Sequence, residues 1–195
     1  SKQHGYSNIV PVYIAQIYFI QKDYKEVISY GQSIYNQSGL KEKEQVAKVV
    51  GQSYFELKDY NAALPFLTDY IAKSSKVPQE DIYQLAYTQY RTANYKKAIP
   101  NFEQLNALKS ELGQNALYNL ADCYLKTDNK TAARLAFQKA AEMDFDNNIK
   151  EDAFINYAKL SYELGFDTEA IAALQKVNEK SDYYTEAQNL LSNIF

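Results

Sequence analysis

The chain has 195 residues, 46% of them apolar, and a formal net charge of −3. That length and apolar fraction suffice for one or two folded domains and argue against intrinsic disorder, while the slight excess of acid argues against a nucleic-acid partner. One cysteine and one histidine are too few for a structural zinc site, and only 6 Gly and 4 Pro favour long helices over short strands.

The most apolar stretch runs from Ile9 to Ile20. It is shorter than the roughly 18 apolar residues that span a bilayer, and it contains Pro11 and Gln16. We therefore interpret it as a buried helix and predict no transmembrane segment. The sequence lacks a signal-peptide pattern and begins with Ser1, which predicts a processed protein or a fragment of a longer chain.

A helical hairpin pattern repeats along the chain. A small residue followed by a tyrosine recurs at intervals of 36, 35, 35 and 37 residues, at Ala15, Gly51, Ala86, Ala121 and Ala158. This period is typical of stacked hairpins, and apolar residues at three- and four-residue steps predict amphipathic helices. The predicted helices pair as 8–21 with 24–37, 41–56 with 60–73, 79–92 with 95–108, 111–126 with 130–143, and 150–164 with 167–179, followed by a last helix at 183–194.

Small residues are expected where paired helices cross, because they let the helix axes approach. They are Gly51, Ala86, Ala121 and Ala158 on first helices and Ala63, Ala98, Ala133 and Ala170 on second helices. Aspartate or asparagine in the short turns is expected to cap each second helix, at Asp23, Asp59, Asn94, Asn129 and Asp167. Pro65 and Pro100 lie early in their helices and predict a slight bend without a break.

These residues resemble the tetratricopeptide repeat (TPR) family. The fourth repeat shows the pattern best, with Ala121, Tyr124, Ala133, Phe137 and Ala140. The likeness covers roughly 9–195, although the family's tryptophan is absent and its turn glycine remains only as Gly165. It implies an all-α, right-handed α-α superhelix, a TPR solenoid of five helical hairpins plus a C-terminal capping helix.

We therefore predict a single TPR domain over residues 1–195. Its repeats are placed at approximately 8–40, 41–78, 79–110, 111–146 and 147–180. The last helix, at 183–194, is interpreted either as a cap on the fifth repeat or as the start of a sixth.

The sequence contains no nucleophile elbow, Gly-rich phosphate loop or metal motif. We predict that the protein is not an enzyme and has no catalytic residues, no metal site and no cofactor. Cys123 is expected to be a packed, inert thiol, and His4 lies in the N-terminal tail.

By resemblance to the family, first helices line a concave groove that binds peptides. The side chains expected there are Lys48, Gln52, Phe55, Tyr83, Tyr87, Tyr90, Arg91, Tyr118, Asp122, Lys126, Lys159 and Tyr162. Tyr83, Tyr87 and Tyr118 are the strongest candidates, because tyrosine combines a large contact area with a polar tip. For Phe55, Tyr90 and Tyr162, packing between neighbouring first helices is an equal alternative.

Some family members bind a chaperone C-terminus through a carboxylate clamp of basic residues. Lys48 and Gln52 resemble its beginning, but Tyr83 and Tyr87 occupy the next basic sites, so the clamp is not supported. Ring contacts should dominate binding, and affinity should depend weakly on salt.

The leading functional prediction is a non-catalytic protein–protein interaction scaffold that binds a peptide or partner helix in an aromatic concave groove. The alternative is a structural or assembly subunit of a bacterial envelope complex that uses its convex face or its repeat ends, including a homo-oligomer. Uncovered apolar flanks at Ile9 or Phe195 would favour that alternative. The Tyr-rich hairpins are similar to large bacterial cell-envelope TPR proteins, which implies the periplasm or cell envelope, with the cytoplasm as the alternative.

Overall fold

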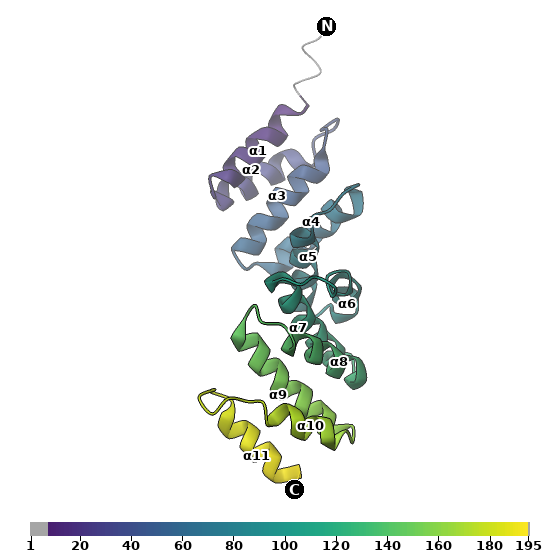
Figure 1. The fold of residues 1–195 in the computed structure, drawn as a ribbon. Helices are drawn as coiled ribbons and strands as arrows, with labels where there is room; N and C mark the ends of the chain where they lie inside the picture. Colours follow the sequence, from purple (N-terminus) through teal and green to yellow (C-terminus); the bar gives the residue numbers. More distant parts are fainter. Residues whose placement is uncertain (1–7, 195) are drawn as a thin grey trace. The chain divides into compact units, whose positions relative to one another are not determined.

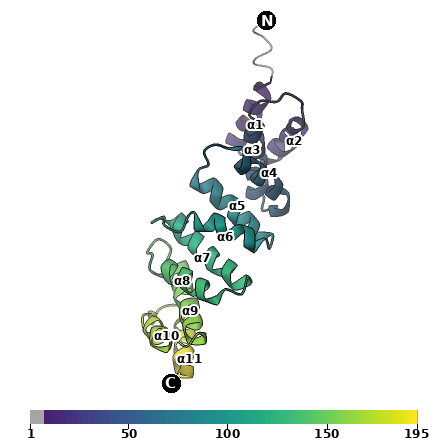
Figure 2. The same ribbon diagram turned by 90° about the vertical axis from the view of Figure 1, so that its right-hand side faces the viewer.

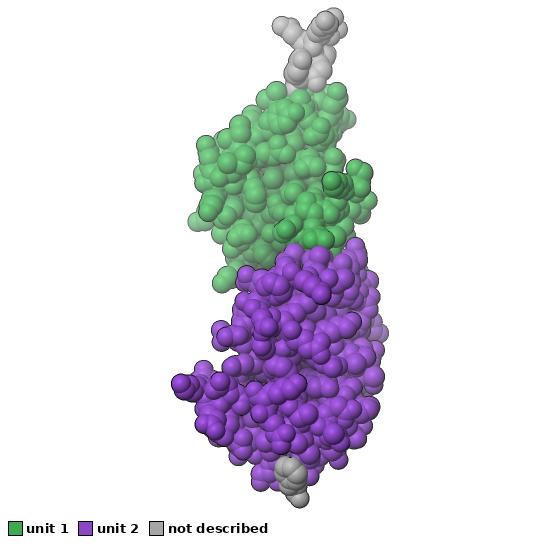
Figure 3. All heavy atoms as spheres, viewed as in Figure 1, with its two compact units in different colours: residues 1–93 green, residues 94–195 purple. Residues whose placement is uncertain are grey.

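The computed structural model describes residues 8–194, which form eleven α-helices and contain no β-strand (Figure 1). The predicted all-α fold class is confirmed. Backbone contacts divide the chain into two compact units, residues 1–93 and 94–195 (Figure 3). None of the described helices is both long and apolar enough to cross a membrane.

Unit 1 consists of two helical hairpins and one further helix. Its helices are α1 (Val10–Ile20), α2 (Tyr24–Tyr35), α3 (Lys43–Glu56), α4 (Tyr60–Lys73) and α5 (Gln79–Arg91). Consecutive helices pack on one another, and α1 also contacts α3 (Figures 1 and 2). The side chains of Val12, Val27, Val46 and Val50 are fully buried in the core that these helices share.

Unit 2 continues the same alternation. Its helices are α6 (Tyr95–Glu103), α7 (Glu111–Lys126), α8 (Lys130–Ala141), α9 (Asn147–Glu163), α10 (Asp167–Leu174) and α11 (Tyr184–Ile194). Each of these helices packs on the next, and α11 packs on both α9 and α10. Phe102, Leu117 and Ile155 are among its fully buried side chains.

The small residues lie at the helix crossings, as predicted. The alanines at both sets of positions are at most 1% exposed, and Gly51 is buried. A Cβ atom built on Gly51 would lie 2.9 Å from the side chain of Leu67 on α4, so α3 and α4 approach too closely for a larger residue.

The turn inside each hairpin uses the same left-handed backbone position. The residues with positive φ there are Lys22 (60°), Lys58 (62°), Ala93 (59°), Asp128 (62°) and Gly165 (79°). In the second hairpin, the Lys58 amide donates to the Phe55 carbonyl at 2.9 Å and the Asp59 amide to the Tyr54 carbonyl at 2.9 Å. This pair of bonds is the Schellman arrangement, which ends the first helix and sets the direction of the second.

Two of the five predicted N-caps form side-chain bonds. Asp59 accepts from the Ala62 amide and Asn129 from the Ala132 amide, both at 3.1 Å. Asp23 and Asn94 precede their helices without a side-chain cap bond, and Phe166 instead of Asp167 holds the N-cap position of α10.

Three helix boundaries differ from the prediction by three residues or more, and the others agree to within two residues. Helix α9 begins at 147 instead of 150, because the Asp146 carboxylate accepts from the Asn148 and Ile149 amides. Helices α6 and α10 end at 103 and 174 instead of 108 and 179. Beyond these ends, backbone amides donate hydrogen bonds to the carbonyl three residues earlier, as in a 3₁₀ turn, and the α-helical pattern stops. Pro65 and Pro100 lie inside continuous helices, as predicted.

Candidate peptide-binding surface

Unit 1 brings aromatic side chains from α3, α4 and α5 into one group, which we name the Tyr87 cluster. Its members are Phe55, Tyr60, Tyr83, Tyr87, Tyr90 and Arg91. Tyr87 is central: its ring centroid lies 6.0 Å from that of Phe55, 5.8 Å from Tyr60, and 5.9 Å from both Tyr83 and Tyr90. Such distances are typical of favourable ring pairs, so each ring holds the next in place.

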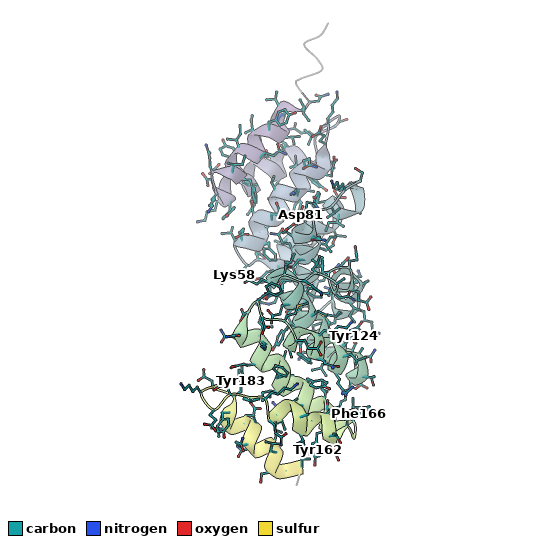
Figure 4. The ribbon with its side chains drawn as sticks, in the orientation of Figure 1. Lys58, Asp81, Tyr124, Tyr162, Phe166 and Tyr183 are labelled. Carbon is teal, nitrogen blue, oxygen red and sulfur yellow. The ribbon has the colours of Figure 1, made fainter. Side chains whose placement is uncertain are left out.

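Local sequence explains why the cluster forms. Tyr83, Tyr87 and Tyr90 recur at four- and three-residue steps and therefore share one face of α5. Phe55 is the penultimate residue of α3 and Tyr60 begins α4, and the left-handed turn at Lys58 (labelled in Figure 4) brings their ring centroids to 5.6 Å.

The ring faces of Tyr83 and Tyr87 are nearly parallel, with 13° between their planes, and the five rings are each half-buried. Half-buried rings leave part of each aromatic surface in contact with solvent. That surface can bind apolar, aromatic or proline side chains, whose desolvation stabilises a complex.

Arg91 places one exposed positive charge beside the rings. Its guanidinium carbon lies 4.6 Å from the ring centroid of Tyr60 and 5.7 Å from that of Tyr87, and its Nη1 donates to the Tyr87 hydroxyl at 3.2 Å. The hydrogen bond with Tyr87 raises the pKa of Arg91 above its usual value, and an arginine guanidinium is charged at every physiological pH even without such a shift. A carboxylate of a bound peptide is the expected counterpart of this charge.

Lys48 and Gln52, also predicted for the groove, take part in a polar network around the buried Asp81 carboxylate. The Asp81 carboxylate, 5% exposed, accepts from Gln52 Nε2 at 2.9 Å and from the Tyr70 hydroxyl at 2.7 Å, and it lies 2.8 Å from Lys48 Nζ (Figure 4). Burial, followed by the bond to Asp81, raises the pKa of Tyr70. These groups bond to one another and join α3, α4 and α5, so they hold in place the three helices that carry the Tyr87 cluster.

In unit 2, Tyr118 takes part in the packing between helices. Its ring meets Phe137 edge to face at 5.5 Å, and its hydroxyl donates to Asp152 on α9. Burial raises the pKa of Tyr118, and the bond to Asp152 raises it further. Asp122 is half-buried and Lys126 is exposed on the same helix, α7.

The last two predicted residues contact the final helix. Lys159 Nζ lies 2.5 Å from the Glu186 carboxylate, and the Tyr162 hydroxyl donates to the Asn193 carbonyl at 3.3 Å (Tyr162 is labelled in Figure 4). Tyr162 is 41% exposed. Both side chains attach α11 to α9.

Five of the twelve predicted residues therefore meet in the Tyr87 cluster, and the prediction missed Tyr60. Tyr60 begins a second helix, whereas the family groove is assigned to first helices. Its spacing of five residues from Phe55, across a turn, was the signal that could have revealed it.

Cys123 is fully buried, and burial raises the pKa of its thiol to about 12, consistent with the predicted inert thiol. Within residues 8–194, no group of acidic, cysteine or histidine side chains is arranged to hold a metal ion. His4 and Phe195 lie outside the described residues.

Tandem helical hairpins with repeated turns define an α-helical repeat protein. Residues 83–148 match the family model of the tetratricopeptide repeat. The sequence signature of the family is therefore present over that segment, and the arrangement of helical hairpins is that of a TPR solenoid. No curated protein matches the chain in sequence.

Several solved structures share this fold. YrrB, described as a TPR protein with an unusual peptide-binding site, is 14% identical over 95% of this chain and 92% of its own, with a TM-score of 0.71. MamA AMB-1 is 13% identical over 94% and 98%, with a TM-score of 0.66. MamA from Desulfovibrio magneticus RS-1 is 15% identical over 94% of each chain, with a TM-score of 0.62.

Proposed function

We propose that the protein is a non-catalytic interaction scaffold that binds an extended peptide or a partner helix on the Tyr87 cluster. The observation that carries this proposal is the group of five half-buried rings beside one exposed guanidinium. Tyrosine and arginine are among the residues most enriched at binding hot spots, because each adds a large contact area and a directed polar group.

The network around Asp81 supports the proposal, because it fixes α5 against α3 and α4 before any ligand binds. A preformed surface loses little conformational entropy on binding. The similarity in fold to YrrB, a TPR protein with a peptide-binding site, also supports a peptide as the ligand.

The test begins with peptides selected from a random phage-displayed library on the full chain. The affinity of an enriched peptide is then measured for the wild type, for Tyr83→Ala/Tyr87→Ala, and for Arg91→Ala. We expect the double variant to bind at least about tenfold more weakly and Arg91→Ala to weaken only peptides that carry an acidic residue. Between about 50 and 300 mM NaCl the wild-type affinity should change little, since ring contacts dominate.

Tyr162→Ala is the matched control, because Tyr162 is a partly exposed tyrosine outside the cluster. Circular dichroism confirms that each variant is folded. Undiminished binding by a folded Tyr83→Ala/Tyr87→Ala variant contradicts the proposal. A single domain over residues 1–195 and a cell-envelope location stay predictions.

A further inference from the structure

Unit 2 contains a cavity of about 610 Å³, which we name the Met143 cavity. It is bounded by the connector between α6 and α7 (residues 104–110), by Leu117 on α7, by Lys139 on α8, and by the connector between α8 and α9 (residues 142–146). Its volume is within the range of about 300 to 1,000 Å³ that is typical of small-molecule sites. The Tyr87 cluster belongs to unit 1 and shares no residue with this cavity.

Apolar side chains form part of the wall. Leu117 contributes from the core of unit 2 and is 1% exposed, whereas Phe145 is 52% exposed. Met143 lies between these extremes and is half-buried. A large ring that is half in contact with water gains free energy when an apolar ligand covers it.

Both connectors are held in place by the protein itself. Gln114 Nε2 donates to the carbonyls of Met143 and Asp146 at 3.0 and 3.2 Å, and these two residues lie on either side of Phe145 in the sequence. On the other connector, the side chain of Leu105 is fully buried. A cavity that is preformed in this way loses little conformational entropy when it binds a ligand.

The charged side chains at the cavity favour an anion. Lys109 and Lys139 line it from opposite connecting elements, and neither forms an ion pair within residues 8–194. The two carboxylates of the wall already have partners: Asp144 pairs with Lys150, and Glu142 accepts a hydrogen bond from a side chain of α8 at 3.3 Å. Three lysines against two carboxylates leave one positive charge, and a lysine ammonium can donate up to three hydrogen bonds to an anion.

A smaller cavity of about 160 Å³ adjoins the first one. The two cavities share Asn106, Leu117 and Lys139, and the smaller one is also lined by Leu120 and Tyr124 (Tyr124 is labelled in Figure 4). The combined space is therefore elongated and has apolar side chains along both parts. This shape suits a straight alkyl chain with one anionic end better than a compact polar molecule.

We propose that the Met143 cavity binds a straight-chain carboxylate of the fatty-acid class. The carboxylate lies between Lys109 and Lys139, and the alkyl chain lies against Leu117, Met143 and Phe145. This site is independent of peptide binding on the Tyr87 cluster.

Met143 is the only methionine of the chain, so a protein labelled with ¹³C in its methionine methyl group reports on the cavity through one NMR signal. Titration of the full chain with sodium decanoate should shift this signal saturably, with a Kd of about 10 μM to 1 mM. Decyltrimethylammonium has the same alkyl chain with a positive head group. It should bind at least about tenfold more weakly, because its charge meets the two lysines.

The variant Lys109→Gln/Lys139→Gln should weaken decanoate binding at least about fivefold. The matched control is Lys96→Gln/Lys97→Gln, because these two lysines are exposed on α6 in the same unit and do not line the cavity. The control should bind decanoate as the wild type does. Circular dichroism confirms that both variants are folded.

Three results overturn the proposal: no saturable shift of the Met143 signal, equal binding of the two decyl compounds, or equal binding by the Lys109→Gln/Lys139→Gln variant. A peptide with an apolar last residue carries the same carboxylate chemistry. If a hexapeptide that ends in a free phenylalanine binds at least about tenfold more tightly than decanoate at the Met143 signal, the proposal is also overturned, because the occupant is then the end of a polypeptide.

Discussion

Replacing Gln114 by alanine should destabilise unit 2 more than replacing any exposed residue. The Gln114 side chain is fully buried, and both its amide nitrogen and its amide oxygen form hydrogen bonds. Its Nε2 donates to the carbonyls of Ala140, Met143 and Asp146 at 3.1, 3.0 and 3.2 Å, and its Oε1 accepts from the Asp146 amide at 2.7 Å. The side chain thereby ties the α8–α9 connection to α7.

The magnitude follows from the groups left without partners. Ala140 and Asp146 keep other bonds to their carbonyls, from the Met143 and Lys150 amides. Among the described residues, the Asp146 amide and the Met143 carbonyl have no other partner. Two orphaned groups at about 1 to 3 kcal/mol each lower the free energy of unfolding by about 2 to 6 kcal/mol.

Urea unfolding followed by circular dichroism measures this loss, and Gln188→Ala on the exposed face of α11 is the matched control. Hydrogen exchange of the Asp146 amide gives a local readout, since that amide should lose its protection in Gln114→Ala. A loss below about 0.5 kcal/mol, with the Asp146 amide still protected, would refute the reasoning.

Three further predictions concern turns, close packing and pH. Ala93→Gly should raise the free energy of unfolding by about 0.5 to 1 kcal/mol in urea titrations, because glycine accepts a φ of 59° without strain, and Gly165→Ala should lower it by about 1 kcal/mol. Gly31→Ala should lower the thermal midpoint, at a cost of about 1 to 3 kcal/mol, because its Cβ would meet Val50 at 2.3 Å; an unchanged midpoint would count against the packing of α2 on α3. Burial raises the pKa of the Cys123 thiol from 9.0 to about 12, so the folded state retains a proton that the unfolded state releases, and stability should fall as the pH rises from about 9 towards 12. Cys123→Ala should reduce that fall in alkaline unfolding curves.

The repeat period, the hairpins and the small crossing residues were predictable because they follow from local spacing. Pro65 and Pro100 were also expected not to break their helices, because they lie within the first two turns, and α4 and α6 are indeed continuous through them. The early end of α6 was not predictable from periodicity. The connector that follows α6 lies so close to Gly113 that a Cβ atom there would come within 2.0 Å of the Leu108 carbonyl oxygen. Steric contacts of that kind become visible only in three dimensions.

The candidate site was predicted in part for a related reason. Family resemblance assigns equivalent roles to equivalent positions, and it therefore grouped Lys48 and Tyr118 with Tyr87. Whether a polar side chain bonds to another part of the protein depends on the partners that the fold brings near it. Asp81 forms an ion pair with Lys48, and Asp152 accepts a hydrogen bond from Tyr118. Those partners lie 33 and 34 residues away in the chain, so no local pattern links them.

The central claim is that the Tyr87 cluster contacts a bound polypeptide. The most direct measurement is an NMR titration of the chain, labelled with ¹³C in its tyrosine rings, with a peptide enriched on the full protein. The account predicts that the ring signals of Tyr83, Tyr87 and Tyr90 shift while those of Tyr124 and Tyr162 stay in place. Saturating peptide that shifts the signals of Tyr124 or Tyr162 and leaves the three cluster tyrosines unchanged would contradict it.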